Sequence, residues 1–485
     1  MADESTQKNV LERFLTDGKM ALDESQTNYA KAILAELSTQ ILNKEIQPSE
    51  HSAAMIVDRI ATIDELLTAQ LNEIMHAPEF QSLESSWRGL FYLVSNTETS
   101  EMLKLRVFNT TRLELQNDLD KAVEFDQSAL FKKVYEEEYG TFGGHPFSTL
   151  VYDHEFSRHP QDMALIEKLA SIAAAAHTPL LSSASPKLFD MESFTELSGP
   201  RDLAKIFESA ELIKWRSFRD SEDSRYVSLM MPHILLRLPY GPDTLPVEEF
   251  NFVEDVDGKD HSKYLWGNAA WAMAQRITTA FALYQWTAAI RGVETGGLVE
   301  GLPVHTFTTD DGDMEVKCPT EIAITDRREK ELSNLGFIPL VYCKGSDYAA
   351  FFGGQTTNKP KIYNLDTANA NARLSSVLPY LLNASRFAHY IKSIMRDKIG
   401  GFMTAEDVQR FLNTWIADYI LLSDNAGQNL KAQYPLREAQ IDVVEVPGKP
   451  GSYTATIFLR PHFQLEELTA SIRLVAALPK PASDY

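Results

Sequence analysis

The chain has 485 residues, of which 44% are hydrophobic and 24% charged, a balance typical of a globular protein with two or three domains. Its formal charge of −22 argues against nucleic acid and anionic membrane surfaces as partners, because both would repel it. A basic protein partner fits this charge better.

Export and redox signals point to the cytosol. The N-terminal MADESTQKNV lacks the basic and apolar segments of a signal peptide. The most membrane-like stretch, Ala269–Ile290, is interrupted by Arg276, so we predict a buried helix there and no membrane insertion. Cys318 and Cys343 have neither metal-ligand spacing nor a disulfide framework.

Residues 1–75 have helical periodicity. A short apolar stripe comes first and comprises Val10, Leu11, Phe14 and Leu15. A second, longer apolar stripe follows and comprises Ile33, Leu34, Leu37, Ile41 and Leu42. An isolated helix of about ten residues is marginal in water, so this one is either a frayed terminus or a segment held by a partner.

Residues 76–375 mix strand and helix signals. A β-rich run covers Phe337–Cys343, and a second run lies in RYVSLMMPHILLRLPYG, where Pro232 and Pro239 bound it or move it to a sheet edge. A helix is expected to begin near Ser198, and the acidic stretch Asp243–Asp260 is expected to be a solvated loop.

Residues 376–485 change in pattern. Amphipathic helices are predicted over Leu378–Asp397 and Ala405–Leu422. The strands Ile441–Val446 and Tyr453–Arg460 flank the turn-rich PGKPG and predict a hairpin, with a helix after it. The fold class is therefore α/β in a mixed α+β form, with a helical N-terminal segment and a C-terminal helix-plus-hairpin domain.

The stretch FFGGQTTNKPKIYN (Phe351–Asn364) approximates a phosphate-binding loop. Counted from Gly353, Asn358 occupies the second glycine position and Pro360 replaces the hydroxyl residue that would bind Mg²⁺. Proline also disfavours helical geometry at Lys359. A glycine-rich turn is the better interpretation.

Other candidate chemistry is weak. His154 and His159 are five residues apart rather than four, which does not match the helical zinc motif, and we interpret them as surface histidines. Asp310–Asp313 lacks the alternating ligands of a calcium loop, and no G-x-S-x-G elbow occurs. No catalytic, cofactor or metal residues are assigned. A scattered catalytic set stays open, so the alternative function is a cytosolic α/β enzyme with an unrecognised site that could depend on a nucleotide.

Several long strings resemble the large subunit of the contractile sheath of bacterial type VI secretion systems, the TssC/VipB family. They include SPKLFDMESFTELSGPRDLAKIF, WRSFRDSEDSRYV, KYLWGNAAW, IRGVETGGLVEGLPVHTFTTDDGD and RPHFQLEELTASIRLVAALP. The resemblance runs from about residue 60 to the C-terminus. It implies a structural protein of the bacterial cytoplasm and no enzymatic activity.

The resemblance also implies a set of partners. The large subunit would pair with the small sheath subunit TssB/VipA, and neighbouring heterodimers would polymerise around a tube of Hcp rings on a membrane-anchored baseplate. Contraction would propel the tube, and the AAA+ ATPase ClpV would recycle the sheath. The expected organisation is an N-terminal segment (1–75) with an ATPase-recognition helix, a central α/β sheath domain (76–375) and a C-terminal sheath domain (376–485).

Three interaction sites follow as hypotheses from the resemblance. The ATPase would bind the helix of Val10, Leu11, Phe14 and Leu15 as a helix in a groove. The tube would contact Glu466 and Glu467, although a solvated helix N-terminus explains these two glutamates as well. Sheath families exchange strands between protomers, and we place that exchange in the predicted hairpin, at Ile441, Val443, Val444, Thr454, Thr456, Ile457 and Phe458. An internal hairpin is the alternative.

Overall fold

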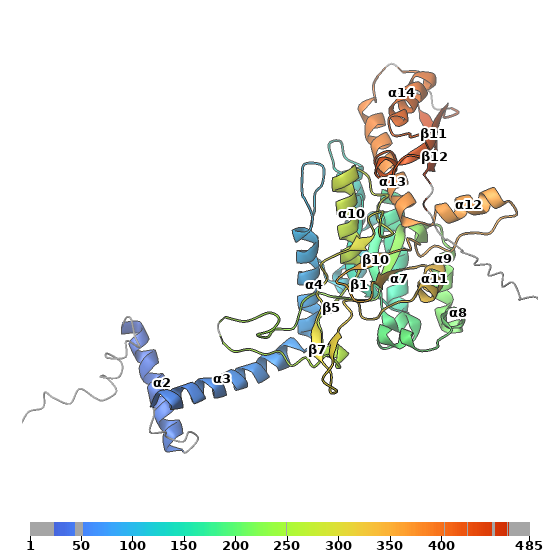
Figure 1. The fold of residues 1–485 in the computed structure, drawn as a ribbon. Coiled ribbons are helices and arrows are strands. Elements are labelled where there is room, and N and C mark those ends of the chain that lie inside the picture. The colour runs from blue at the N-terminus through green and yellow to red at the C-terminus, as the bar shows by residue number, and fades with distance from the viewer. Residues whose placement is uncertain are drawn as a thin grey trace, which may run out of the picture. The chain divides into compact units, whose positions relative to one another are not determined.

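The computed structural model describes residues 24–43, 52–248, 250–401, 403–423, 425–448, 452–462 and 464 (Figure 1). The chain divides into two compact units. The first comprises Met1–Ala77 and Pro239–Asp255, and the second comprises Pro78–Leu238 and Val256–Tyr485. Among the described helices, none combines the length and the apolar character needed to cross a membrane.

The described residues of the first unit include two helices, α2 (Glu24–Leu42) and α3 (Ser52–Met75). Arg59 of α3 donates a hydrogen bond to Gln40 of α2, with Nη2 and Oε1 2.6 Å apart. The C-terminal end of α3 is hydrogen-bonded to the acidic stretch Asp243–Asp260: the backbone N–H of Asp255 donates to Asn72 Oδ1 at 2.9 Å. Within that stretch Glu254 is buried and lies 3.4 Å from His76 Nε2, so the expected solvated loop is anchored at this point.

The second unit is built on a six-stranded sheet in the order β1-β2-β3-β9-β10-β6. The first four strands are parallel, and β10 and β6 complete the sheet in antiparallel pairing. The strands are β1 (Leu150–Phe156), β2 (Leu180–Ala184), β3 (Val227–Met231), β9 (Phe337–Tyr342), β10 (Ala349–Phe351) and β6 (Leu298–Val299).

Both faces of the sheet are covered, and β3 shows why. Its side chains alternate, so that Val227, Leu229 and Met231 enter one core cluster while Met230 enters the other. The first cluster also contains α7 (Pro160–Ala176), and the second contains α10 (Ala270–Tyr284), which lie on opposite sides of the sheet in Figure 1. Such double coverage explains the nearly continuous apolar runs of the central strands.

The remaining elements surround this sheet. Helix α4 (Pro78–Ser95) packs on the outer side of α10, where a Cβ on Gly89 would meet the indole of Trp271 at 2.3 Å. The other helices are α5 (Arg112–Lys121), α6 (Ala129–Phe131), the π-helix Lys132–Tyr139, α8 (Leu203–Phe207), α9 (Ile213–Asp220), α11 (Asp326–Asn334) and α12 (Asp366–Leu374), with 3₁₀ turns at Phe125–Gln127, Pro186–Phe189, Phe194–Ser198, Ala210–Leu212, Asp223–Tyr226 and His261–Lys263. Short strands β4 (Ile234–Leu235) with β5 (Trp266–Gly267) and β7 (Thr306–Thr308) with β8 (Met314–Val316) form two small antiparallel pairs.

The C-terminal part has its own core. Helices α13 (Leu378–Asp397), α14 (Ala405–Ala417) and α15 (Gln428–Gln433) precede the hairpin of β11 (Leu436–Glu445) and β12 (Tyr453–Pro461). Trp286 stacks on Phe387 with ring centroids 4.5 Å apart, beneath α14 and the hairpin. This cluster is separate from the two clusters of the central sheet.

Most of the elements expected from the sequence are present. The mixed α/β class and the buried helix within Ala269–Ile290 are confirmed. Helix α14 ends five residues before the predicted Leu422, because the chain leaves the helix to run beside β11, where the N–H of Leu421 donates to Leu436 O at 2.8 Å. Strand β3 lies inside the sheet rather than at its edge, since Pro232 follows its last residue and removes none of its ladder bonds.

Candidate functional site

The glycine-rich stretch is a structural turn whose centre, Thr356–Asn358, is buried. Thr356 Oγ1 donates to Ser376 O at 2.9 Å, and Thr357 Oγ1 donates to Ser224 O at 2.7 Å. The side-chain amide of Asn358 donates to Ser224 Oγ at 2.9 Å. These polar groups are buried and already paired with the protein. The turn therefore ties the start of α13 to the segment before β3, which supports the interpretation as a glycine-rich turn.

A cluster of charged side chains, of which Glu321 is buried and Glu155 and His233 are half-buried, lies at the carboxyl ends of β1 and β3, where ligands bind in many open α/β sheets. His233 lies between two carboxylates: its Nε2 is 2.7 Å from Glu155 Oε1, and its Nδ1 contacts Glu321. Ser193 Oγ donates to Glu321 Oε1 at 2.6 Å. The cluster joins β1, the segment after β3, the 3₁₀ helix near Phe194 and the segment before α11.

The electrostatics of the cluster favour a structural role. Burial alone would lower the pKa of His233, but Glu155 and Glu321 raise it to about 10. Burial would raise the pKa of Glu321, but its hydrogen bond with His233 holds that pKa well below its usual range. The imidazole is therefore protonated near neutral pH and has no lone pair with which to act as a general base. Ser193 is bonded to the glutamate and not to the histidine.

The two histidines considered as metal ligands have other partners. His154 Nε2 lies 3.3 Å from Asp162 Oδ1, and Nδ1 of His159 accepts the Gln161 N–H at 3.3 Å to cap α7. Burial would raise the pKa of Asp162, but hydrogen bonds from His154 and Ser157 lower it to about 2. His154 is half-buried, so the interpretation of both residues as surface histidines is wrong for this one. Among the residues described, no three His, Cys, Asp or Glu side chains gather as a metal-ligand set.

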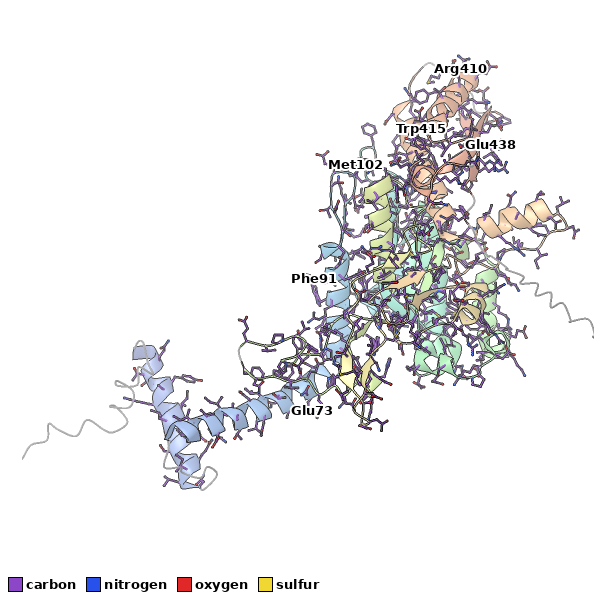
Figure 2. All side chains as sticks on the ribbon, viewed as in Figure 1. Glu73, Phe91, Met102, Arg410, Trp415 and Glu438 are labelled. Carbon is purple, nitrogen blue, oxygen red and sulfur yellow. The ribbon has the colours of Figure 1, made fainter. Side chains whose placement is uncertain are left out.

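The C-terminal hairpin has one packed face and one exposed face. Ile441 and Val443 are buried against α13 and α14, with Ile457 packed beside them. The opposite face carries Val444 and Phe458 exposed, together with Thr454 and Thr456. Figure 2 marks Trp415 of α14 and Glu438 of β11 in this part of the chain. The alternation read from the sequence is thus the alternation of the two faces.

One edge of the hairpin is closed by side chains of α14. Asn413 accepts the N–H of Ile441 through Oδ1 at 3.0 Å and donates to Ile441 O through Nδ2 at 2.7 Å. Gln409, one turn earlier, accepts the Val443 N–H at 3.1 Å. Two amides at i and i+4 therefore take the place of a neighbouring strand along β11.

These bonds determine the direction of the β12 backbone groups. Since Ile441 and Val443 turn their N–H groups away from β12, their partners Ile457 and Ala455 also form non-hydrogen-bonded pairs in the ladder. The N–H and C=O groups of Ala455 and Ile457 consequently point outward along β12. Within the described part of the chain, no hydrogen bond is made to these outward groups. Among the described residues, nothing pairs with the β12 edge.

Most of the chain matches two models of a known protein family. Residues 57–358 match the model of the VipB family described as EvpB/VC_A0108, tail sheath N-terminal domain, and residues 367–478 match the VipB_2 model, the tail sheath gpW/gp25-like domain. The chain is also 54% identical over 423 residues to the type VI secretion system sheath protein TssC1 of Pseudomonas aeruginosa, covering 87% of this chain and 85% of that protein. The chain belongs to the VipB tail-sheath family. The predicted role as a structural subunit of a contractile type VI secretion sheath is confirmed.

Two solved structures share a weak likeness with this sheath protein. One is the baseplate of the anti-feeding prophage, with a TM-score of 0.36, 10% identity and coverage of 65% of this chain and 66% of that chain. The other is the contracted helical sheath of the same particle, with a TM-score of 0.35, 9% identity and coverage of 67% and 69%. Similarity at this level carries no conclusion about the present chain.

The predicted interaction residues divide into two groups. All seven hairpin residues lie on β11 and β12, and the structure brings them together in one small sheet. The recognition residues Val10, Leu11, Phe14 and Leu15 and the glutamates Glu466 and Glu467 lie outside the described residues. Sequence reasoning missed Gln409 and Asn413, which decide which edge is open. Their signal is a pair of amides at i and i+4, beside the apolar Leu412 of a helix that precedes a hairpin.

Proposed function

We propose that this sheath protein is the large subunit that co-polymerises with a small sheath subunit, TssB/VipA, in the bacterial cytoplasm. The polymer surrounds a tube of Hcp rings, stands on a membrane-anchored baseplate and contracts to propel the tube. The subunit itself has no enzymatic activity, and ATP is used by ClpV, which recycles the contracted sheath. The family assignment and the identity to a named type VI sheath protein support this proposal.

The observation that carries the assembly proposal is the open edge of β12. An exposed strand edge pairs readily with another chain, and such edges are usually protected unless pairing is intended. The β11 edge is protected by Asn413 and Gln409, whereas the outward groups of Ala455 and Ile457 have no partner among the described residues. A strand from a neighbouring subunit adds here, in a head-to-tail contact that repeats along an open helix.

The test uses proline at two neighbouring positions of β12, one in a non-hydrogen-bonded pair and one in a hydrogen-bonded pair. Ala455→Pro removes an outward N–H and leaves the hairpin ladder intact, because Ala455 is in a non-hydrogen-bonded pair. Co-expressed with the small subunit, this variant should give soluble heterodimers and no long hollow tubules in negative-stain electron microscopy. Ala455→Ser keeps the N–H and should give tubules like those of the wild type.

A second control separates edge loss from unfolding. Thr456 lies in a hydrogen-bonded pair with Asp442, so Thr456→Pro breaks the hairpin itself and should lower the thermal stability of the chain. Ala455→Pro should leave the melting temperature close to that of the wild type. Long tubules formed by Ala455→Pro would reject the edge as the site of strand exchange.

The ATPase and tube contacts stay proposals from the family resemblance. Deleting residues 1–20, which include Phe14, should leave assembly intact and abolish ClpV binding in a pulldown. Unchanged binding would reject the recognition helix.

Reversing the charge of Glu466 and Glu467 should weaken co-purification of the Hcp tube. Unchanged co-purification would leave these glutamates as a solvated helix start. The division at residues 75 and 375 is likewise proposed, and limited proteolysis would test it.

A further inference from the structure

A pocket of about 390 Å³ opens beside helix α12 in the second unit. Helix α12 extends away from the central sheet in Figure 1 and has no buried residue, so one wall of the pocket is an exposed helix. Pockets of roughly 300–1,000 Å³ hold small molecules in many proteins. The polar lining of this pocket includes Asp220, Glu222, Arg225, Lys359, Lys361 and Asn371.

The wall opposite the solvent is fixed by the protein itself. The side-chain amide of Asn358 donates to Ser221 O at 2.8 Å, and the backbone N–H of Lys359 donates to Arg219 O at 2.9 Å. These bonds hold the end of the glycine-rich stretch against the segment that follows α9. The pocket therefore has its shape before any ligand enters, which lowers the entropy cost of binding.

Arg225 is the unpaired cation of this pocket. It is half-buried, and its guanidinium forms no hydrogen bond or ion pair with any described residue. Its Nε is shielded from solvent and has no hydrogen-bond partner. Leaving a shielded, charged donor without an acceptor is costly, so an arginine in this position indicates an acceptor that comes from outside the described chain.

The carboxylates of the pocket act on other cations. Glu222 lies 3.3 Å from Lys361 Nζ. Burial lowers the pKa of Arg219 to about 10, and Asp220 opposes that shift, so the charge of Asp220 acts on Arg219. Lys359 is exposed and forms no ion pair with the described residues. The pocket is thus left with positive charge, although the chain as a whole carries −22.

We propose that this pocket binds a small free molecule through a phosphate or carboxylate group, with the guanidinium of Arg225 as its main donor and Lys359 as a second cation. A guanidinium donates two parallel N–H bonds to either kind of group. A free anion is favoured over a carboxylate on the surface of another chain, because it must enter the pocket to reach the half-buried guanidinium. The inference does not depend on the role in the sheath.

Binding would also join two parts of the second unit. Arg225 belongs to the 3₁₀ helix Asp223–Tyr226, whereas Asn371 belongs to α12, and its side chain forms no hydrogen bond with the described residues. An anion that contacts both would hold α12 against the body of the unit. We therefore expect the ligand to reduce local opening of α12.

The first experiment titrates the full chain with inorganic phosphate and, separately, with citrate at low ionic strength, followed by calorimetry. Arg225→Gln should weaken binding of the preferred anion at least about tenfold, because it removes a charge-assisted pair of hydrogen bonds. Arg225→Lys keeps the charge without the planar donor pair and should bind with intermediate affinity. The control, Arg373→Gln, removes the same charge from an exposed residue of α12 that does not line the pocket, and should bind as the wild type does.

The two anions distinguish the group that the pocket prefers, and tighter binding of either one supports the inference. Without anion, Arg225→Gln should melt no lower than the wild type, since its guanidinium has no internal partner to lose. Absence of binding by both anions, equal weakening in Arg225→Gln and Arg373→Gln, or a lower melting temperature of Arg225→Gln overturns the inference.

A second measurement uses the unaltered chain. Hydrogen exchange of the α12 amides should slow in the presence of the preferred anion, while exchange in the distant hairpin of β11 and β12 should not change. Unchanged exchange in α12 overturns the inference. So does a chain that binds neither anion but loses tubule formation on Lys359→Glu, because the pocket would then receive a carboxylate of a neighbouring subunit.

Discussion

The six-stranded sheet and the two-stranded hairpin sheet are completed in different ways. The larger sheet is covered on both faces by helices, and its strands contribute alternately to two core clusters of the same chain. The hairpin is covered on one face and closed along β11 by two amide side chains, while no described residue pairs with its β12 edge. The first sheet completes its packing within the subunit, whereas the second has the backbone edge to which we propose that another subunit adds a strand.

The largest expected effect concerns the self-contained sheet. Trp215 is fully buried and stacks on Phe337 of β9, with ring centroids 5.6 Å apart and planes 6° from parallel. Trp215→Ala should lower the free energy of unfolding by about 3–5 kcal/mol, because it removes a large core side chain and leaves a cavity. Denaturant unfolding of the full chain, alone and with the small subunit, measures this loss. A loss that appears only in the heterodimer would contradict a partner-independent core.

The charge cluster gives a pH-dependent prediction for the same unit. His233→Gln should cost about 3 kcal/mol near pH 6, because Glu155 and Glu321 then lose the cation between them. The raised pKa of His233 makes its contribution complete below its usual value of 6.5 and lost as the pH rises toward about 10. The lowered pKa values of the two glutamates make their contribution present at and above their usual range and lost in acid.

The stability advantage of the wild type over His233→Gln should therefore shrink between pH 6.5 and pH 10. Thermal unfolding of both proteins across that range measures it. A constant difference would mean that His233 is not protonated in the folded protein.

The closed edge of the hairpin gives a smaller effect. Asn413→Ala leaves the Ile441 N–H and C=O without partners and should lower the free energy of unfolding by about 1–3 kcal/mol. It should also open a second edge and promote irregular aggregation, seen by light scattering. Thr414→Ala, which changes an exposed neighbour on the same helix, is the matched control. Equal behaviour of the two variants would show that the α14 amides do not protect β11.

The smallest effect belongs to the exposed face. Phe458 is 52% exposed and lies opposite Gln440 on the outer side of the hairpin. Phe458→Ser should change the free energy of unfolding of the isolated chain by less than about 0.5 kcal/mol, since it removes no core contact. A larger loss in denaturant unfolding would mean that this face is packed within the subunit.

Periodic elements are predictable from this sequence, whereas open edges are not. Helix α13 has the predicted bounds because Pro379 and the long apolar periodicity mark it locally. The hairpin is predictable from alternation and the PGKPG turn, and both are local signals too. Which of its edges is open depends on Asn413 reaching Ile441, a contact across 28 residues that no periodicity encodes. The sequence likewise does not predict that Trp87 and Phe91 are exposed, because an outward apolar row on α4 has the same residue spacing as a buried row.

The central claim is that the β12 edge receives a strand from another subunit. Electron cryo-microscopy of the sheath assembled from this chain and its small subunit tests it directly. We predict a strand of a neighbouring subunit hydrogen-bonded to the outward groups of Ala455 and Ile457, while Asn413 and Gln409 stay bonded to β11. A β12 edge that borders solvent, or that pairs with residues of its own chain, would contradict the claim.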